Sequence, residues 1–178
     1  MAKTLIAFYS RRGENYVNGG IKFLERGNNE LIVDQLKKYL PDAEVFRIDT
    51  VKKYADDYMV CIEEAKQELR EKARPELTDS VKDFEQYSTI FVGSPIWWGE
   101  PPMIMHTFCE AYPQLKDKVI VPFGTHGGSG VSTVTNMLKQ YYPDATFLAT
   151  KGMAGTDARK DSAKGEIESW LKQIKIID

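Results

Sequence analysis

Two adjacent tryptophans lie in a loop bounded by proline and glycine, where their side chains could meet a flat ligand. Large flat aromatic side chains suit stacking on a conjugated ring. Neighbouring side chains point in different directions, so one indole can pack inward while the other stays at the rim. A loop held down by both indoles is the alternative, but exposed aromatic residues often mark binding. The loop contains Ser94, Pro95, Ile96, Trp97, Trp98 and Gly99.

A glycine-rich segment follows a later apolar run and could aim backbone donors at the edge of a ligand. It lacks the Gly-Lys-Ser/Thr ending of a phosphate loop, and no G-x-G-x-x-G follows the first apolar run, so the usual dinucleotide fold is disfavoured. His126 could contact a ring carbonyl, donate a proton or cap the next helix. The segment reads Gly124, Thr125, His126, Gly127, Gly128, Ser129 and Gly130.

A third polar segment is split in two along the chain. Ser10 and Arg11 follow the first apolar run, and Gly27-Asn28-Asn29 precedes the first amphipathic run. The start of a helix offers unpaired N–H groups that suit a phosphate. Capping of the helix by Asn28 or Asn29, without any ligand, is the alternative. The stretch between the two parts is expected to be an excursion over the site.

These three segments are positioned by alternating strands and helices. Five strands joined by helices predict one α/β domain over residues 1–178, with a doubly wound parallel sheet and helices on both faces. The order 2-1-3-4-5 is one of two common solutions, and ligands then bind at the carboxyl ends of the strands. All three segments follow such ends. The expected strands are 4–9, 44–49, 89–93, 119–123 and 145–149, and the expected helices are 31–40, 54–69, 104–112, 131–141 and 167–174.

Composition and the absence of certain motifs disfavour several classes of protein. The 178 residues carry 24 Lys and Arg against 26 Asp and Glu, which disfavours a nucleic-acid partner. A metal site is not expected, because the sequence has no cluster of His, Cys and carboxylate residues. A hydrolase is not supported, because there is no Gly-x-Ser-x-Gly elbow. Cys61 and Cys109 are expected to be free thiols in a reducing compartment, with a disulfide as the alternative. Without a signal pattern or an apolar run of about 18 residues, a cytoplasmic location and no membrane span are expected.

The three segments together resemble the flavodoxin family over nearly the whole chain. That family has a phosphate loop after its first strand that ends in Gly-Asn-Thr. Here Ser10 opens the loop and Gly27-Asn28-Asn29 resembles its end, with residues 11–26 as an insertion. Bacterial members with a Tyr-Ser-Arg start and a Pro-Ile-Trp-Trp-Gly loop are the most similar, and Pro95 to Gly99 match that second motif.

The resemblance implies FMN as the cofactor. FMN is preferred to FAD because the chain offers one phosphate site and no room for an adenosine half. Trp97 or Trp98 would stack on the ring and Gly99 would lie beside it, while residues 125–128 would line its other edge. Arg11 and Arg12 would pair with the phosphate or meet an anionic partner.

The implied function is electron transfer through the flavin to a redox partner protein. An NAD(P)H-dependent FMN or quinone oxidoreductase, with a small-molecule acceptor, is the alternative. The oligomeric state is left open. The expected cofactor-binding residues are Ser10, Arg11, Asn28, Asn29, Pro95, Ile96, Trp97, Trp98, Gly99, Thr125, His126, Gly127 and Gly128.

Overall fold

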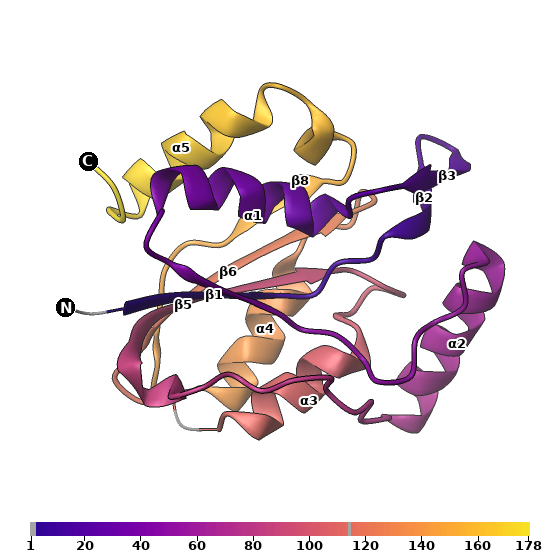
Figure 1. Ribbon diagram of the computed structural model, residues 1–178, viewed down its shortest axis with the longest axis horizontal. Coiled ribbons are helices and arrows are strands. Elements are labelled where there is room, and N and C mark those ends of the chain that lie inside the picture. Colours follow the sequence, from indigo (N-terminus) through magenta and orange to yellow (C-terminus); the bar gives the residue numbers. More distant parts are fainter. Residues whose placement is uncertain (1–2, 114) are drawn as a thin grey trace.

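A parallel β-sheet forms the centre of the computed structural model, which describes residues 3–113 and 115–178. The strands lie in the order β4-β1-β5-β6-β7, and β8 also pairs with β6 (Figure 1). Every pair in this sheet is parallel. The strands are β1 (Lys3–Phe8), β4 (Glu44–Arg47), β5 (Tyr87–Pro95), β6 (Val119–His126), β7 (Thr146–Phe147) and β8 (Lys151–Ala154).

The sheet is six-stranded and not five-stranded, because β8 follows the last expected strand, 145–149, in which only β7 forms, and also pairs with β6. β7 pairs with the beginning of β6 and β8 with its end. Between them the chain turns away from β6, and the Ala149 carbonyl accepts a hydrogen bond from the Trp170 indole at 2.8 Å. The expected order 2-1-3-4-5 therefore needs this correction at its last position.

Helices cover both faces of the sheet, as expected. α1 (Asn28–Tyr39) and α5 (Ala163–Gln173) lie on one face, and α3 (Met103–Ala111) and α4 (Ser132–Tyr141) lie on the other (Figure 1). Successive residues of β1 alternate between the two cores, so Ile6 packs with the first pair of helices and Leu5 with the second. Burial on both faces explains why the central strands are continuous apolar runs.

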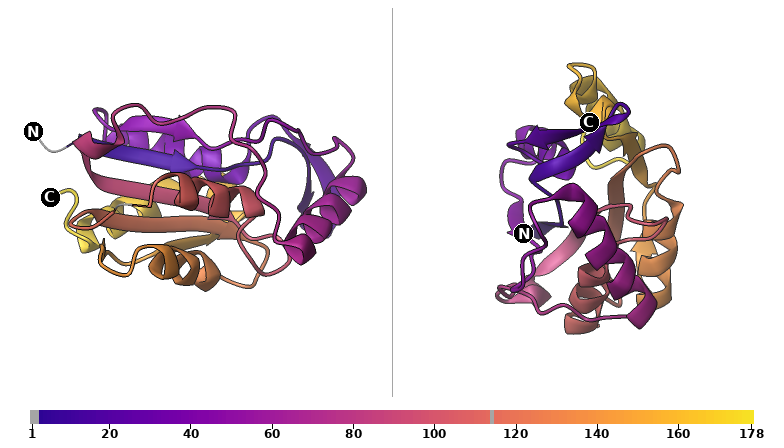
Figure 2. Two further views of the ribbon diagram at one scale, coloured as in Figure 1. Left: turned by 90° about the horizontal axis from the view of Figure 1, so that it is seen from below. Right: turned by 90° about the vertical axis from the view of Figure 1, so that its right-hand side faces the viewer.

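α2 (Tyr58–Glu71) does not cover the sheet but stands beyond the carboxyl ends of the strands (Figure 2). It begins after Asp57, whose carboxylate accepts a hydrogen bond from the Val60 N–H at 2.9 Å. The expected helix start near Tyr54 is therefore four residues too early. Two short 3₁₀ helices complete the helical elements, η1 (Phe84–Gln86) and η2 (Asp157–Arg159).

The excursion expected between β1 and α1 is an ordered hairpin of β2 (Gly13–Val17) and β3 (Gly20–Leu24). Its turn has positive φ angles at Asn18 (49°) and Gly19 (80°), typical of a two-residue type I′ turn. The hairpin lies beside α2 in two views (Figures 1 and 2). The Glu14 carboxylate accepts a hydrogen bond from the Tyr58 N–H at 2.7 Å, which joins the two elements.

Both cysteines are buried free thiols, Cys61 on α2 and Cys109 on α3. Burial raises the pKa of the Cys61 thiol to about 11 and that of the Cys109 thiol to about 12. Neither thiol is therefore charged near neutral pH. No helix among the described residues has the length and apolar character needed to cross a membrane.

Candidate functional site

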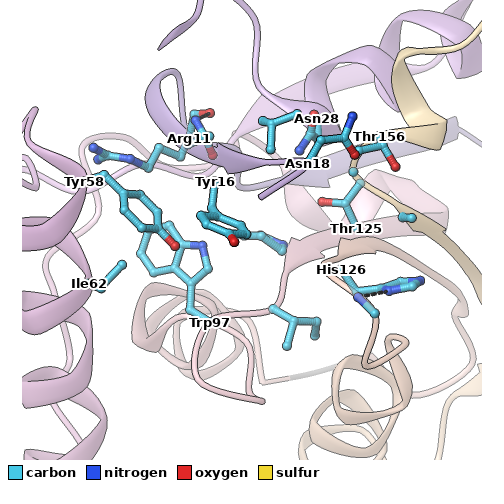
Figure 3. Close-up of a pocket in the computed structure, with 18 of the residues that line it drawn as sticks. Arg11, Tyr16, Asn18, Asn28, Tyr58, Ile62, Trp97, Thr125, His126 and Thr156 are labelled. Atoms are coloured by element: carbon cyan, nitrogen blue, oxygen red, sulfur yellow. Dashed lines mark hydrogen bonds between the residues drawn. The ribbon is translucent and has the colours of Figure 1, made fainter. Parts of the chain in front are cut away.

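A pocket of about 530 Å³ opens at the carboxyl ends of the strands (Figure 3). Its volume falls within the range of about 300–1,000 Å³ typical of small-molecule sites. The structure brings the three segments singled out in the sequence to this one pocket. The expected residues that line it are Arg11, Asn28, Pro95, Ile96, Trp97, Trp98, Thr125, His126, Gly127 and Gly128.

One end of the pocket is polar. Asn18, Asn28, Thr125 and Thr156 gather there from the hairpin, α1, β6 and the segment after β8 (Figure 3). Asn28 is also the first residue of α1, and its backbone N–H has no acceptor among the described residues. Amide and hydroxyl donors beside the positive end of a helix dipole suit a phosphate.

Glu30 follows Asn28 by two residues in α1 and is almost fully buried, with 2% of its side chain exposed. Its carboxylate accepts a hydrogen bond from the Gly27 N–H at 2.8 Å and forms ion pairs with Arg12 and Arg47. Burial raises the Glu30 pKa, but the bonds from Arg12, the Gly27 N–H and Arg47 outweigh it and leave the pKa below its usual value. Arg12 therefore pairs with Glu30 and is not among the described residues that line the pocket, so of its two expected roles only the meeting with an anionic partner stays a prediction.

Ser10 and Asn29, two of the expected ligands, lie behind the pocket wall. The Ser10 hydroxyl accepts a hydrogen bond from the Glu30 N–H at 3.3 Å, and the Asn29 amide donates to the Tyr9 carbonyl at 3.3 Å. Both side chains are buried and join the end of β1 to the start of α1. A direct role for them in cofactor binding stays a prediction.

The opposite end of the pocket is aromatic. Trp97 meets Tyr9 and Tyr54 edge to face, with ring centres 5.4 Å and 5.2 Å away. Across from it, Tyr16 of the hairpin stacks with Tyr58 of α2 at 6.3 Å between ring centres (Figure 3). The packing of Trp97 leaves its orientation fixed, as a platform for a flat ligand requires.

Trp98, which also lines the pocket, is held by α2. Its indole N–H donates to the Ile62 carbonyl at 2.8 Å, and Lys66 Nζ lies 4.8 Å from the ring centre. The Trp98 and Gly99 φ angles of 55° and 81° form a tight turn closed by backbone hydrogen bonds between Trp97 and Glu100. Gly99 does not line the pocket, and its place beside a ring stays a prediction.

The glycine-rich turn after β6 contributes His126, Gly127 and Gly128 to the pocket lining. The Gly128 N–H donates to His126 Nδ1 at 2.9 Å, so the proton of a neutral His126 ring is on Nε2. Gly127 and Gly128 are exposed, and their lack of side chains leaves the backbone accessible to a ligand. His106 is not near this turn and instead contacts the Tyr141 hydroxyl through Nδ1 at 2.9 Å.

Arg11 ties the base of the hairpin to the segment before α2. Its guanidinium donates to the carbonyls of Glu14, Ala55 and Asp56 at 2.9, 2.9 and 3.0 Å. These acceptors are neutral backbone carbonyls, and no ion pair involves Arg11 among the described residues. Arg11 lines the pocket, but its guanidinium lies beside Tyr58 and not at the polar end (Figure 3), so its pairing with a phosphate stays a prediction.

Sequence reasoning placed the hairpin segment over the site but named none of its lining residues, and it missed the contributions of α2 and of the segment after β8. The hairpin had a recognisable signal, because Val17-Asn18-Gly19-Gly20 is typical of a type I′ turn. Nothing comparable marked the other two segments as parts of the site. The missed lining residues are Asn15, Tyr16, Val17, Asn18, Gly19, Tyr58, Cys61, Ile62, Ala65, Ala154, Gly155 and Thr156.

Comparison with known proteins agrees with this geometry. Residues 23–174 match the sequence profile of flavodoxin. The chain belongs to the flavodoxin family. No curated protein matches this flavodoxin-family chain.

Solved structures share the fold over almost the full length. A Bacteroides eggerthii protein assigned as a flavoprotein has 25% identity and a TM-score of 0.75, covering 99% of this chain and 100% of its own. One from Bacteroides uniformis has 23% identity and a TM-score of 0.71, covering 96% and 98%. A Lactobacillus acidophilus flavoprotein solved in complex with FMN has 16% identity and a TM-score of 0.65, covering 96% and 99%.

Family membership confirms the expected flavodoxin-like α/β fold and FMN as the cofactor. The residues present also fit such a group. A flavin mononucleotide carries an anionic phosphate at one end and a flat ring at the other, and this pocket has an amide- and hydroxyl-lined end and an aromatic end. Among its described lining residues there is no Asp or Glu that would repel a phosphate.

Proposed function

We propose that this protein transfers electrons through FMN held in the pocket, with the phosphate at the polar end and the ring at the aromatic end. The observation that carries the proposal is that Asn28, at the start of α1, and Trp97, in the loop after β5, line one and the same pocket. Bound FMN supplies one- and two-electron redox chemistry.

At the polar end, the side chains of Asn28, Thr125 and Thr156 would donate hydrogen bonds to the phosphate. Arg11 is the single cationic side chain among the described lining residues, but its guanidinium, bonded to the Ala55 and Asp56 carbonyls, lies on the side of Tyr58 and not at this end (Figure 3). Hydrogen bonds to a charged acceptor are the stronger kind. This end would therefore supply a large part of the binding free energy.

At the aromatic end, Trp97 and the stacked pair of Tyr16 and Tyr58 would hold the ring and keep water from its faces. The backbone at Gly127 and Gly128 would serve the ring edge. Aromatic faces disfavour a negative charge on the ring and lower its reduction potential, and the cation of Arg11 beside Tyr58 offsets only part of this effect. We expect a midpoint potential below that of free FMN.

The rim of the aromatic end suits a transient encounter with a redox protein. Tyr16 and Trp98 are 60% and 47% exposed, and they flank the mouth of the pocket. Electron-transfer encounters bury little surface and are weak. A carrier would therefore need no larger docking surface than this rim.

A small-molecule acceptor is the second candidate, and the hairpin favours it. Tyr16 stacks on Tyr58 and so encloses the aromatic end, which an enzyme for NAD(P)H and a quinone would use as a substrate pocket. This reading is the NAD(P)H-dependent FMN or quinone oxidoreductase.

Two measurements test these functions. The visible spectrum of the purified protein, with the released cofactor identified, should show FMN; a colourless protein without FMN affinity would refute both candidates. Stopped-flow mixing with NADPH then separates them. Rapid bleaching by NADPH alone supports the enzyme, while bleaching only after addition of a flavodoxin reductase supports the carrier.

A further inference from the structure

We propose that Arg159 is a positioning residue that makes the pocket selective for a phosphate ester, acting through the side chain of Asn28. The inference rests on the proposed placement of the FMN phosphate. Arg159 ends η2, far along the chain from α1. Its Nη1 donates to Asn28 Oδ1 at 3.1 Å and to the Arg26 carbonyl at 3.0 Å, so one guanidinium bridges the start of α1.

The bond from Arg159 fixes which way the Asn28 amide faces. An amide group has an oxygen that accepts and a nitrogen that donates, and a guanidinium can only donate. Because Arg159 occupies Oδ1, the Nδ2 group remains as a donor at the pocket. An anionic phosphate needs donors, and the opposite amide orientation would present it with an oxygen.

Gly155 holds the other side of the same amide. A Cβ at this position would lie 2.5 Å from Asn28 Nδ2, closer than atoms can approach, so only glycine leaves room for the amide. The Gly155 N–H donates to the His126 carbonyl at 3.0 Å, which fixes the backbone there. Asn28 is thus held between a guanidinium and a bare stretch of backbone.

Arg159 also keeps its positive charge available to the site. Its side-chain partners, the Arg26 carbonyl and the Asn28 amide oxygen, are both uncharged, and no ion pair involves it within the described ranges. A charged donor on Oδ1 polarises the amide and strengthens the donor at Nδ2. The neighbouring Lys160, in contrast, is paired with Asp157 at 2.6 Å.

The test compares FMN with riboflavin, which has the same ring but no phosphate. Apoprotein is titrated with each ligand, and the quenching of flavin fluorescence gives the dissociation constants. Losing a bond that supports a charged hydrogen bond should weaken FMN binding by about tenfold in Arg159→Gln, with riboflavin binding unchanged. Lys160→Gln makes the same change of charge at the next residue and should bind both ligands like the wild type.

A double-mutant cycle shows whether Arg159 acts through Asn28. If it does, Arg159→Gln adds no further loss of FMN affinity in an Asn28→Ala background. Gly155→Ala should also weaken FMN and spare riboflavin, because its methyl group displaces the amide. Raising the salt concentration screens a distant charge but not an orientation, so the Arg159→Gln effect should persist in high salt.

Each outcome decides between the readings. Additive losses in the cycle, or equal losses for riboflavin and FMN, overturn the positioning role while leaving the FMN site intact. A wild-type apoprotein that binds neither flavin overturns the proposed function itself. A circular dichroism spectrum and an unfolding curve for each variant confirm that it is folded.

Discussion

Glu30 provides the sharpest test of how the start of α1 is held. Two of its bonds are substantially shielded from water, those from the Gly27 N–H and Arg47, and each is worth about 1.5 kcal/mol, the lower end for a hydrogen bond to a charged group. The third partner, Arg12, has 56% of its side chain exposed and adds at most about 1 kcal/mol. Glu30→Gln should therefore lower the free energy of unfolding by about 3 kcal/mol at pH 7.

In a chain of this size, that loss corresponds to a Tm lower by about 6–12 °C. Urea unfolding followed by circular dichroism measures the free energy directly. Asp34→Asn is the matched control on the same helix, because the Arg26–Asp34 pair is exposed on both sides and should contribute less than about 1 kcal/mol.

The effect must depend on pH in one direction. The Glu30 pKa is lower in the folded protein than its ordinary value of 4.5, so its contribution is present above that value and is lost as the pH falls through the folded pKa. The unfolding curves of the wild type and Glu30→Gln should converge below pH 4.5. A difference under about 0.5 kcal/mol at pH 7, or one that does not shrink in acid, would refute the reasoning.

Four further outcomes are expected. Gly27→Ala places a Cβ 2.1 Å from Ser10 Oγ and should destabilise the fold by about 1–3 kcal/mol in urea unfolding; an unchanged midpoint would contradict the close approach. Gly99→Val forces a side chain at φ 81° and should shift the FMN midpoint potential in a redox titration. An unchanged potential would show that Gly99 does not act on the flavin. Burial that raises the Cys61 pKa to about 11 should make its alkylation by iodoacetamide at pH 8 slow until urea is added; fast labelling of the native protein would argue against it. Tyr16→Ala should weaken FMN and riboflavin equally, because it acts at the ring end, and a loss for FMN alone would misplace the ring.

The parts of the site that follow strand ends could be predicted from the sequence. Trp97 and Thr125 each follow an apolar run with glycine or proline nearby, and parallel strands bring their carboxyl ends to one edge. Asn28 could be placed there because it begins the first helix. Once short apolar strands are recognised between helices, the parallel topology alone brings the residues that follow them to one edge of the sheet.

Other parts depend on contacts between distant residues, which a pattern does not carry. Arg12 could not be separated from Arg11, because only the fold shows that one meets the buried Glu30 and the other meets backbone carbonyls. The expected helix from Tyr54 was too long because the helical spacing of apolar residues continues before Asp57. The structure shows that Asp57 caps the start of the helix. The extra strand β8 begins just after Ala149, whose carbonyl bonds to the Trp170 indole, a contact between residues distant in the sequence.

The short strands at the two edges of the sheet affect how readily other chains can pair with this protein. β7 and β8 have two and four residues and form one border of the sheet, and β4, with four residues between Glu44 and Arg47, forms the other. Short edge strands expose few consecutive unpaired N–H and C=O groups with which a strand of another chain could pair. Strand-to-strand stacking into fibres is thereby discouraged at both margins, even though the interior strands are among the most apolar segments of the protein.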